Sequence, residues 1–192
     1  LEYVVELKFD GLSVMLIYEH GRLVRGATRG DGKNGEDITA NLRTIKAIPL
    51  EIEDNSFSVL EARGEVYIKR KDFFKLNEKR IEKGESPFAN PRNAAAGSVR
   101  LLDPAITASR PLDIFFFNIG EHEPKQFSTH EEVLKRLKKL GFKVSDHCKV
   151  CKNFKEVLEQ VELWENKIKT LDYDVDGLVI KVNSLKQRGK LG

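Results

Sequence analysis

Several residue types are scarce in this sequence, and each shortage excludes a class of protein. The 192 residues include two cysteines, Cys148 and Cys151, too few for a disulfide framework. Their Cys-x-x-Cys spacing supplies half of a structural zinc site, which needs four ligands, and no second pair exists. His130 and His147 could complete such a site, but their spacing does not indicate one. We therefore expect two reduced thiols in a cytoplasmic protein, with a metal site or a redox pair as the alternatives.

Long apolar runs and a strong net charge are also missing. No stretch approaches the roughly 18 apolar residues of a membrane helix, and the first residues follow a strand pattern rather than that of a signal peptide. We therefore expect no membrane partner. The net charge is +3 and the pI is about 8.8, so composition does not argue for a large nucleic-acid surface. A content of 40% hydrophobic and 33% charged residues is ordinary for a globular domain.

The first informative feature of the sequence is a lysine flanked by two carboxylates. Residues 1–10 are rich in β-branched and aromatic side chains, which predicts a strand. Alternation places Glu6, Lys8 and Asp10 on one face of that strand. Gly11 follows, and it permits a sharp turn or the close approach of a ligand. The sequence therefore presents an amine at the end of an apolar strand.

Such an amine can act as a covalent nucleophile once it loses its proton. Burial and neighbouring cations favour the neutral amine, whereas adjacent carboxylates favour the charged one. The carboxylates of Glu6 and Asp10 therefore need another task, such as binding a base, a ribose or a metal. The alternative is a solvated strand face with alternating charges.

The remaining pattern predicts an α+β fold with mostly antiparallel strands. Residues 128–132 hold two overlapping capping boxes that begin a helix. The expected strands cover 1–10, 12–18, 22–28, 57–68, 112–119, 142–150 and 175–182. The expected helices cover 37–45, 70–83, part of 88–102, 129–140 and 153–168. In the last helix, we expect these side chains to face inward: Val157, Leu158, Val161, Trp164 and Ile168.

Seven short motifs follow one another in order along the chain. They are Glu6-Leu-Lys-Phe-Asp-Gly-Leu-Ser13, Gly26-Ala-Thr-Arg-Gly-Asp-Gly32, Gly35-Glu-Asp-Ile-Thr-Ala-Asn41, Arg43-Thr-Ile45, Glu61-Ala-Arg-Gly-Glu65, Phe88-Ala-Asn-Pro-Arg-Asn-Ala-Ala-Ala-Gly-Ser98 and Asp176-Gly-Leu-Val-Ile-Lys-Val182. In order and spacing they resemble the adenylation domain of bacterial NAD-dependent DNA ligases. Each piece alone is unspecific, whereas the combination is highly specific. The resemblance implies the nucleotidyltransferase, ATP-grasp-like fold, with mostly antiparallel sheets and flanking helices around a nucleotide cleft.

The resemblance also implies a reaction and its participants. The lysine amine would attack the α-phosphorus of NAD, expel nicotinamide mononucleotide and keep AMP. The AMP would pass to the 5′-phosphate of nicked double-stranded DNA, and the 3′-hydroxyl would displace it. In such transfers positioning and charge stabilisation dominate. NAD and Mg²⁺ are the implied cofactors, and a monomer in the bacterial cytoplasm that serves DNA replication and repair is the implied setting.

Catalytic roles fall, by resemblance, on Lys8, Asp10 and Lys181. Lys8 would be the nucleophile. Lys181 would face the nucleotide, offset charge on the α-phosphate and help keep Lys8 neutral; on the sequence alone it is a lysine of an exposed edge strand. Asp10 would share a metal ion, since Mg²⁺ prefers oxygen ligands and keeps several waters.

Binding roles are implied in the same way. Glu6 would accept a hydrogen bond from the adenine amino group, and Arg29 would reach the ribose or phosphate with its planar donor fork. Glu65 would bind ribose hydroxyls or hydrated Mg²⁺. Asp176 is a further candidate for the metal or for orienting Lys181.

DNA contacts are implied for Arg92 and Arg100, which otherwise would be helix-surface arginines. The loop from Gly30 to Gly35 has three glycines, whose backbone N–H groups could face phosphates, although it lacks P-loop spacing. We expect residues 1–192 to be a fragment of the adenylation domain. It would lack the segment that grips nicotinamide mononucleotide, the last nucleotide-binding strand and the C-terminal DNA-binding domains. Such a fragment should not seal nicks.

Three alternatives stay open. An ATP-dependent polynucleotide ligase or an RNA-capping nucleotidyltransferase shares Lys-x-Asp-Gly, although the glycine loop and the Asn-Pro-Arg-Asn-Ala-Ala-Ala-Gly run argue against it. A non-catalytic nucleotide- or nucleic-acid-binding module would keep its function after Lys8→Ala. A purely structural domain would gain no thermal protection from AMP or NAD.

Overall fold

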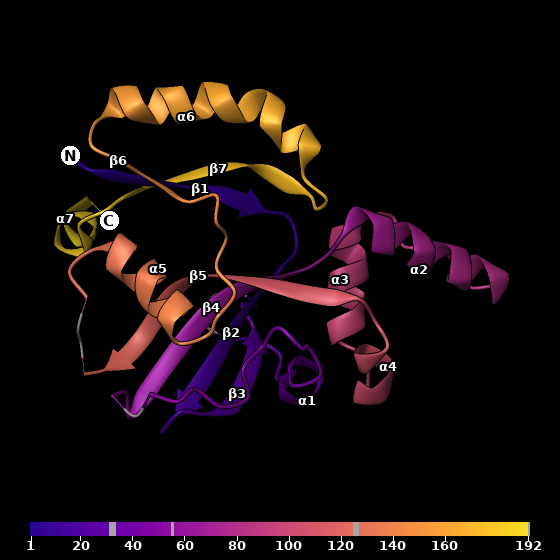
Figure 1. The fold of residues 1–192 in the computed structure, drawn as a ribbon. Helices are drawn as coiled ribbons and strands as arrows, with labels where there is room; N and C mark the ends of the chain where they lie inside the picture. The colour runs from indigo at the N-terminus through magenta and orange to yellow at the C-terminus, as the bar shows by residue number, and fades with distance from the viewer. Residues whose placement is uncertain (31–33, 55, 125–126, 192) are drawn as a thin grey trace.

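Two antiparallel sheets form the frame of the molecule (Figure 1). The computed structural model describes residues 1–30, 34–54, 56–124 and 127–191. The small sheet has the strand order β6-β1-β7, and the large sheet has the order β3-β2-β4-β5. The strands are β1 (Tyr3–Phe9), β2 (Leu12–Glu19), β3 (Arg22–Thr28), β4 (Val59–Ile68), β5 (Leu112–Glu123), β6 (Lys149–Cys151) and β7 (Val175–Val182).

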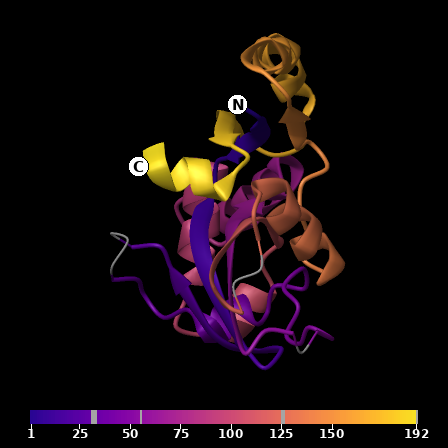
Figure 2. The same cartoon turned by 90° about the vertical axis from the view of Figure 1, so that its left-hand side faces the viewer.

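The helices cover these sheets from outside. They are α1 (Thr39–Leu42), α2 (Arg70–Glu82), α3 (Pro91–Val99), α4 (Pro104–Ala108), α5 (His130–Lys139), α6 (Phe154–Lys167), the 3₁₀ turn η1 (Ile168–Thr170) and α7 (Leu185–Leu191). Helix α6 contacts all three strands of the small sheet, and α5 packs on β5. In both views α6 and the small sheet lie at one end of the molecule and β3 at the other (Figure 1 and Figure 2).

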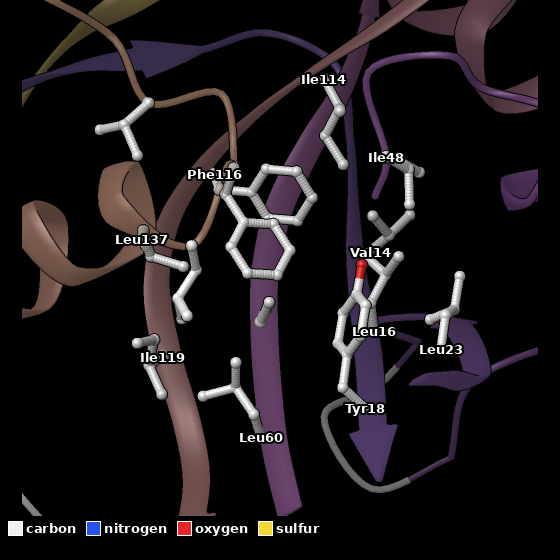
Figure 3. Close-up of a cluster of buried hydrophobic side chains, with 14 of the residues drawn as sticks. Val14, Leu16, Tyr18, Leu23, Ile48, Leu60, Ile114, Phe116, Ile119 and Leu137 are labelled. Carbon is white, nitrogen blue, oxygen red and sulfur yellow. The ribbon is translucent and has the colours of Figure 1, made fainter. Parts of the chain in front are cut away.

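The main core lies on one face of the large sheet. Strand β2 buries alternate side chains, Val14, Leu16 and Tyr18, because strand side chains point to opposite faces. They meet side chains of β4 and β5 and, across from them, Leu137 of α5 (Figure 3). The Tyr18 hydroxyl donates to the Pro49 carbonyl at 2.7 Å, so the loop after α1 also closes over this core.

A second cluster joins the two sheets. Leu7 of β1 packs with aromatic side chains from both sheets and from the segment after α6. Phe9 stacks on Phe115 with 4.6 Å between centroids, and Phe115 stacks on Tyr67 at 5.0 Å. Offset aromatic pairs of this kind add specific geometry to apolar burial. The cluster therefore fixes the carboxyl end of β1 above β4.

The expected fold class is confirmed, as are most elements. Strand β7 has the expected bounds, and α2 ends one residue before the expected Lys83. Helix α5 begins with a capping box in which the Thr129 hydroxyl accepts from the Glu132 N–H and the Glu132 carboxylate accepts from the Thr129 N–H. Of the two overlapping capping boxes in the sequence, the one formed by Thr129 and Glu132 is present in the structure.

Three expectations at the element level are corrected. The expected helix over 37–45 is the single turn of α1. The expected strand over 142–150 shrinks to β6, because Phe142 and Val144 are buried one by one in an irregular segment instead of pairing along a sheet. In α6, Val157 and Trp164 form the buried seam, whereas Leu158 is 48% exposed. One residue past Val157 turns the side chain about 100° around the helix, away from the sheet.

Candidate active site

One cavity of about 500 Å³ gathers the residues that the sequence singled out. It lies between the carboxyl half of β1, strand β7, the start of β2 and the end of β3, and residues within β4 and β5 complete it, with α3 at its rim. Of the predicted site residues, these line it: Glu6, Lys8, Arg29, Glu65, Arg92, Arg100, Asp176 and Lys181. Asp10 is not among its lining residues and lies just beyond, in contact with Arg92.

Lys8 reaches this cavity from the end of β1. Its partner across the sheet is Gly177, and the pairing register shifts between Lys8 and Phe9. Gly177 has φ +134, a backbone conformation that suits glycine. Bulges of this kind re-aim a side chain next to a site. The Lys8 amine lies 3.5 Å from Asp176 Oδ2 and its side chain is 56% exposed. Asp176 therefore stands beside Lys8 rather than beside Lys181.

Glu6 and Lys181 form an ion pair between β1 and β7, in which Glu6 is buried and Lys181 is half-buried. Lys181 Nζ lies 2.7 Å from Glu6 Oε2, and His130 Nε2 lies 2.8 Å from the same oxygen. Burial acts to raise the pKa of Glu6, but the hydrogen bond from His130 and the charge of Lys181 outweigh it and hold that pKa below its ordinary value. The carboxylate of Glu6 is therefore ionised, although its side chain is only 5% exposed.

The amine of Lys181 is thus directed onto Glu6 while it lines the same cavity as Lys8. It also lies 5.4 Å from the centroid of the Phe117 ring, within the range of a cation–π contact. The cavity is therefore lined by both lysines that the sequence predicted for one nucleotide site, Lys8 near the carboxyl end of β1 and Lys181 on β7 opposite Val4.

Glu65 of β4 is the most perturbed acid of the cavity. Burial raises its pKa to about 7, although the Ser13 hydroxyl and the Gly11 backbone N–H donate to its carboxylate. Gly11 itself is required by close packing, since a Cβ there would lie 2.2 Å from the Val66 carbonyl oxygen. The glycine of the Lys-x-Asp-Gly motif thus allows the turn between β1 and β2 to lie directly on β4.

Two arginines mark the rim next to α3. Arg92, in the first turn of α3, contacts Asp10 Oδ1 at 3.4 Å, and Arg100, after its last turn, contacts Glu36 at 2.5 Å. Both side chains are substantially exposed, at 59% and 42%. Gly30 lines the cavity, but half of the glycine loop, residues 31–33, lies outside the described residues. The rim therefore offers exposed guanidinium groups to an anionic ligand.

Carboxylates suited to a hydrated metal ion lie together at the turn after β1. Asp10 and Glu65 interact electrostatically, and Arg92 is close to both. In the described parts of the chain no group of three or more His, Cys, Asp or Glu side chains is arranged to hold a metal directly. This donor set fits Mg²⁺, which keeps several waters and needs few protein ligands.

The two cysteines take no part in the cavity. Both are free thiols; Cys151 is buried and Cys148 is half-buried. Burial raises the pKa of Cys148 to about 12, so its sulfur is protonated at neutral pH and unreactive.

Within the residues that the structure describes, no helix is both long and apolar enough to cross a bilayer.

Sequence reasoning missed two residues of this site, His130 and Phe117. The sequence pattern treats His130 as one residue of a helix start and Phe117 as part of a buried strand. The structure buries His130 completely against Glu6 and leaves the Phe117 ring at the cavity wall. A histidine next to a capping box is the one local signal that could have pointed to His130; Phe117 had none.

Comparison with known proteins identifies the family. The family model for the NAD-dependent DNA ligase adenylation domain matches residues 1–192. The chain belongs to this family. The adenylation domain is 54% identical over all 192 residues to DNA ligases of Clostridioides difficile (strain 630) and Acetivibrio thermocellus, and 53% identical to that of Oceanobacillus iheyensis. It spans 28–29% of the length of these relatives.

The fold of the adenylation domain is shared with a more distant solved structure. A mycobacterial DNA ligase D complexed with ATP and MES matches with a TM-score of 0.56 over 95% of this chain and 49% of that one. The sequence identity is 13%, so this likeness concerns the fold alone. The expected nucleotidyltransferase fold is confirmed.

Proposed function

We propose that this adenylation domain transfers AMP from NAD to its own Lys8, as the first step of nick sealing by a full-length DNA ligase. One observation supports this most directly: a lysine nucleophile, a second lysine and the predicted base- and ribose-binding carboxylates line a single cavity in a member of this family. Each transfer depends on placing reactants and stabilising charge, which is what this arrangement provides.

Lys8 performs the covalent step. Its neutral amine attacks the α-phosphorus of NAD, a P–N bond forms, and the P–O bond to nicotinamide mononucleotide breaks. The amine loses a proton in the process, and nicotinamide mononucleotide leaves with the bonding electron pair. The exposed Lys8 side chain can reach a phosphate in the open cavity, and Asp176 restrains it from the neighbouring strand.

The remaining residues of the cavity hold the adenosine. Glu6 accepts from the 6-amino group of the base, and Phe117 offers its ring face for stacking. Glu65 binds the ribose hydroxyls, and Arg29 reaches the ribose or phosphate. Lys181 offsets the charge of the phosphate, although its amine is paired with Glu6 in this structure. Mg²⁺, held through water by Asp10 and Glu65, with Asp176 as a further ligand, would add charge stabilisation at the phosphate.

DNA enters in the later steps. The bound AMP passes to the 5′-phosphate of a nick, and the 3′-hydroxyl displaces it. Arg92 and Arg100 stand at the rim, where their guanidinium groups can contact DNA phosphates. In the cell this reaction would serve DNA replication and repair in the bacterial cytoplasm.

Intact mass spectrometry of a full-length ligase that contains this domain tests the proposal. After incubation with NAD, we expect an added adenylate that is absent from Lys8→Ala and Lys8→Arg and present in Lys71→Ala, an exposed lysine of α2 outside the cavity. Adduct formation from ATP but not NAD would favour the ATP-dependent alternative. An adduct that persists in Lys8→Arg would overturn the role of Lys8.

A further inference from the structure

The carboxylate of Glu6 has two different oxygens. Oε2 receives both the imidazole of His130, at 2.8 Å, and the amine of Lys181, at 2.7 Å. Among the described residues no hydrogen bond reaches Oε1, and Glu6 lines the cavity. Oε2 therefore already has two protein partners, whereas Oε1 can accept a hydrogen bond from a ligand.

His130 is held rigidly where it makes this contact. Its side chain is completely buried. Its backbone N–H donates to the Asn183 carbonyl at 2.8 Å, and the next residue, Glu131, donates its N–H to the Asn183 side chain at 3.0 Å. Asn183 in turn donates its backbone N–H to the Glu2 carbonyl at 2.8 Å. The imidazole is thus anchored to the strands that provide Glu6 and Lys181.

The chemistry of the pair fixes the direction of the hydrogen bond. An ionised carboxylate can accept hydrogen bonds but cannot donate them. Burial lowers the pKa of His130, so its ring is neutral and carries one proton. Nε2 lies 2.8 Å from Glu6 Oε2 and 3.2 Å from Lys181 Nζ, and the shorter contact, to an acceptor, favours the proton on Nε2. His130 Nδ1 is then a buried acceptor that has no partner among the described residues. A buried, unpaired Nδ1 costs free energy. We therefore infer that this tautomer is kept because its Nε2–H stabilises the carboxylate of Glu6.

We propose that His130 is a positioning residue for base selection: it keeps Glu6 an acceptor, so the site takes a 6-aminopurine dinucleotide and rejects its 6-oxopurine counterpart. This rests on the proposed function, in which Glu6 faces the base. The 6-amino group of adenine donates to Oε1. The 6-oxo group of hypoxanthine is itself an acceptor, so it would meet a carboxylate oxygen with no proton between them. Sites built on buried hydrogen bonds reject such analogues strongly, because in the pose of the 6-aminopurine both oxygens stay unpaired.

Without His130, the acceptor state of Glu6 weakens. Lys181, with a further charge interaction from Arg188 of α7, would then stabilise the buried carboxylate without the hydrogen bond of His130, and burial favours its protonated form. A protonated Glu6 can donate to a 6-oxo group. Loss of His130 should therefore reduce discrimination between the two bases, and low pH should reduce it further.

The test compares self-adenylation by full-length ligase with NAD and with nicotinamide hypoxanthine dinucleotide. The variants are His130→Leu, which removes the donor, and His130→Gln, whose amide N–H can replace Nε2–H. His122→Leu is the control, since His122 does not line the cavity. Thermal melting checks that each variant is folded.

We expect the ratio of kcat/KM for NAD over the hypoxanthine dinucleotide to fall about tenfold or more in His130→Leu and to stay within about threefold of the wild type in His130→Gln and His122→Leu. Lowering the pH from about 8 to about 6 should increase use of the hypoxanthine dinucleotide by His130→Leu but not by the wild type. Equal losses for both dinucleotides in His130→Leu would overturn the positioning role while leaving the proposed function intact. No adduct from NAD on the wild type would instead overturn the proposed function.

Discussion

Glu65 links the protonation of a single side chain to the stability of the fold. Its pKa is raised by burial from the ordinary 4.5 to about 7, so between these values the folded chain holds a proton that the unfolded chain has lost. The folded state therefore loses stability as pH rises through this window. We expect the wild type to show this slope in urea unfolding at a series of pH values and Glu65→Gln to lack it.

Glu51→Gln is the matched control, because Glu51 is 72% exposed and pairs with Arg22 outside the cavity. It should keep the slope of the wild type. An unchanged slope in Glu65→Gln would show that another group releases the proton.

Arg100 gives a second prediction at this scale. If its exposed guanidinium contacts a DNA phosphate, Arg100→Ala in the full-length ligase should slow sealing by the pre-adenylated enzyme more than it slows self-adenylation. The slope of log affinity for nicked DNA against log salt should fall by about 1. Arg22→Ala, which removes an arginine away from the cavity, should leave both unchanged. A loss confined to self-adenylation would place Arg100 on the nucleotide instead.

Most of the site residues that the sequence predicted lie within a recognisable motif, and those that it missed lie outside one. Lys8, Glu65 and Lys181 lie in recognisable motifs, and the structure brings them to one cavity. Phe117 lines the same cavity, and His130 contacts Glu6 of the cavity wall; both are brought there by tertiary packing. A buried histidine next to a helix cap and an aromatic residue within an apolar strand look the same in sequence whether they face a ligand or the core.

At the scale of elements, local chemistry predicted helices with caps better than strands without turn signals. Helix α5 has a capping box and a regular apolar face, and its bounds agree with the sequence pattern. The segment over 142–148 has alternating apolar residues, but it buries Phe142 and Val144 with one backbone hydrogen bond to β5, from the Phe116 N–H to the Lys143 carbonyl, and not as a paired strand. Pairing depends on a neighbouring strand, which local sequence does not specify.

The cap of α5 gives a prediction at this scale. Thr129→Ala removes the acceptor for the Glu132 N–H, at 3.3 Å, and should lower the free energy of unfolding by about 1 kcal/mol, or Tm by about 2–4 °C. Thr129→Ser keeps the hydroxyl and should stay close to the wild type. Calorimetry of the three proteins measures this. A Thr129→Ala protein as stable as the wild type would mean that the cap contributes nothing to folding.

At the scale of the whole molecule, the chain spans less than a third of its curated relatives. The cavity is proposed to bind a nucleotide, whereas encircling and aligning a nick needs a far larger surface. We expect these 192 residues alone to gain modest thermal protection from AMP or NAD and to seal no nicks in a gel assay. Efficient sealing by this chain would contradict that expectation, and a complete lack of protection would favour a purely structural domain.

The strand order of the small sheet sets which part of the site loosens first. Strand β1, which carries the proposed nucleophile Lys8, is hydrogen-bonded on both sides, whereas β7 is an outer strand and is followed closely by α7. Lys181 lies on β7, and Asn183 ties His130 to its end. A pull transmitted through α7 would peel β7 from its single neighbour, so Lys181 and the anchor of His130 would separate from Glu6, while Glu6 and the proposed phosphate on Lys8 stayed with the central strand.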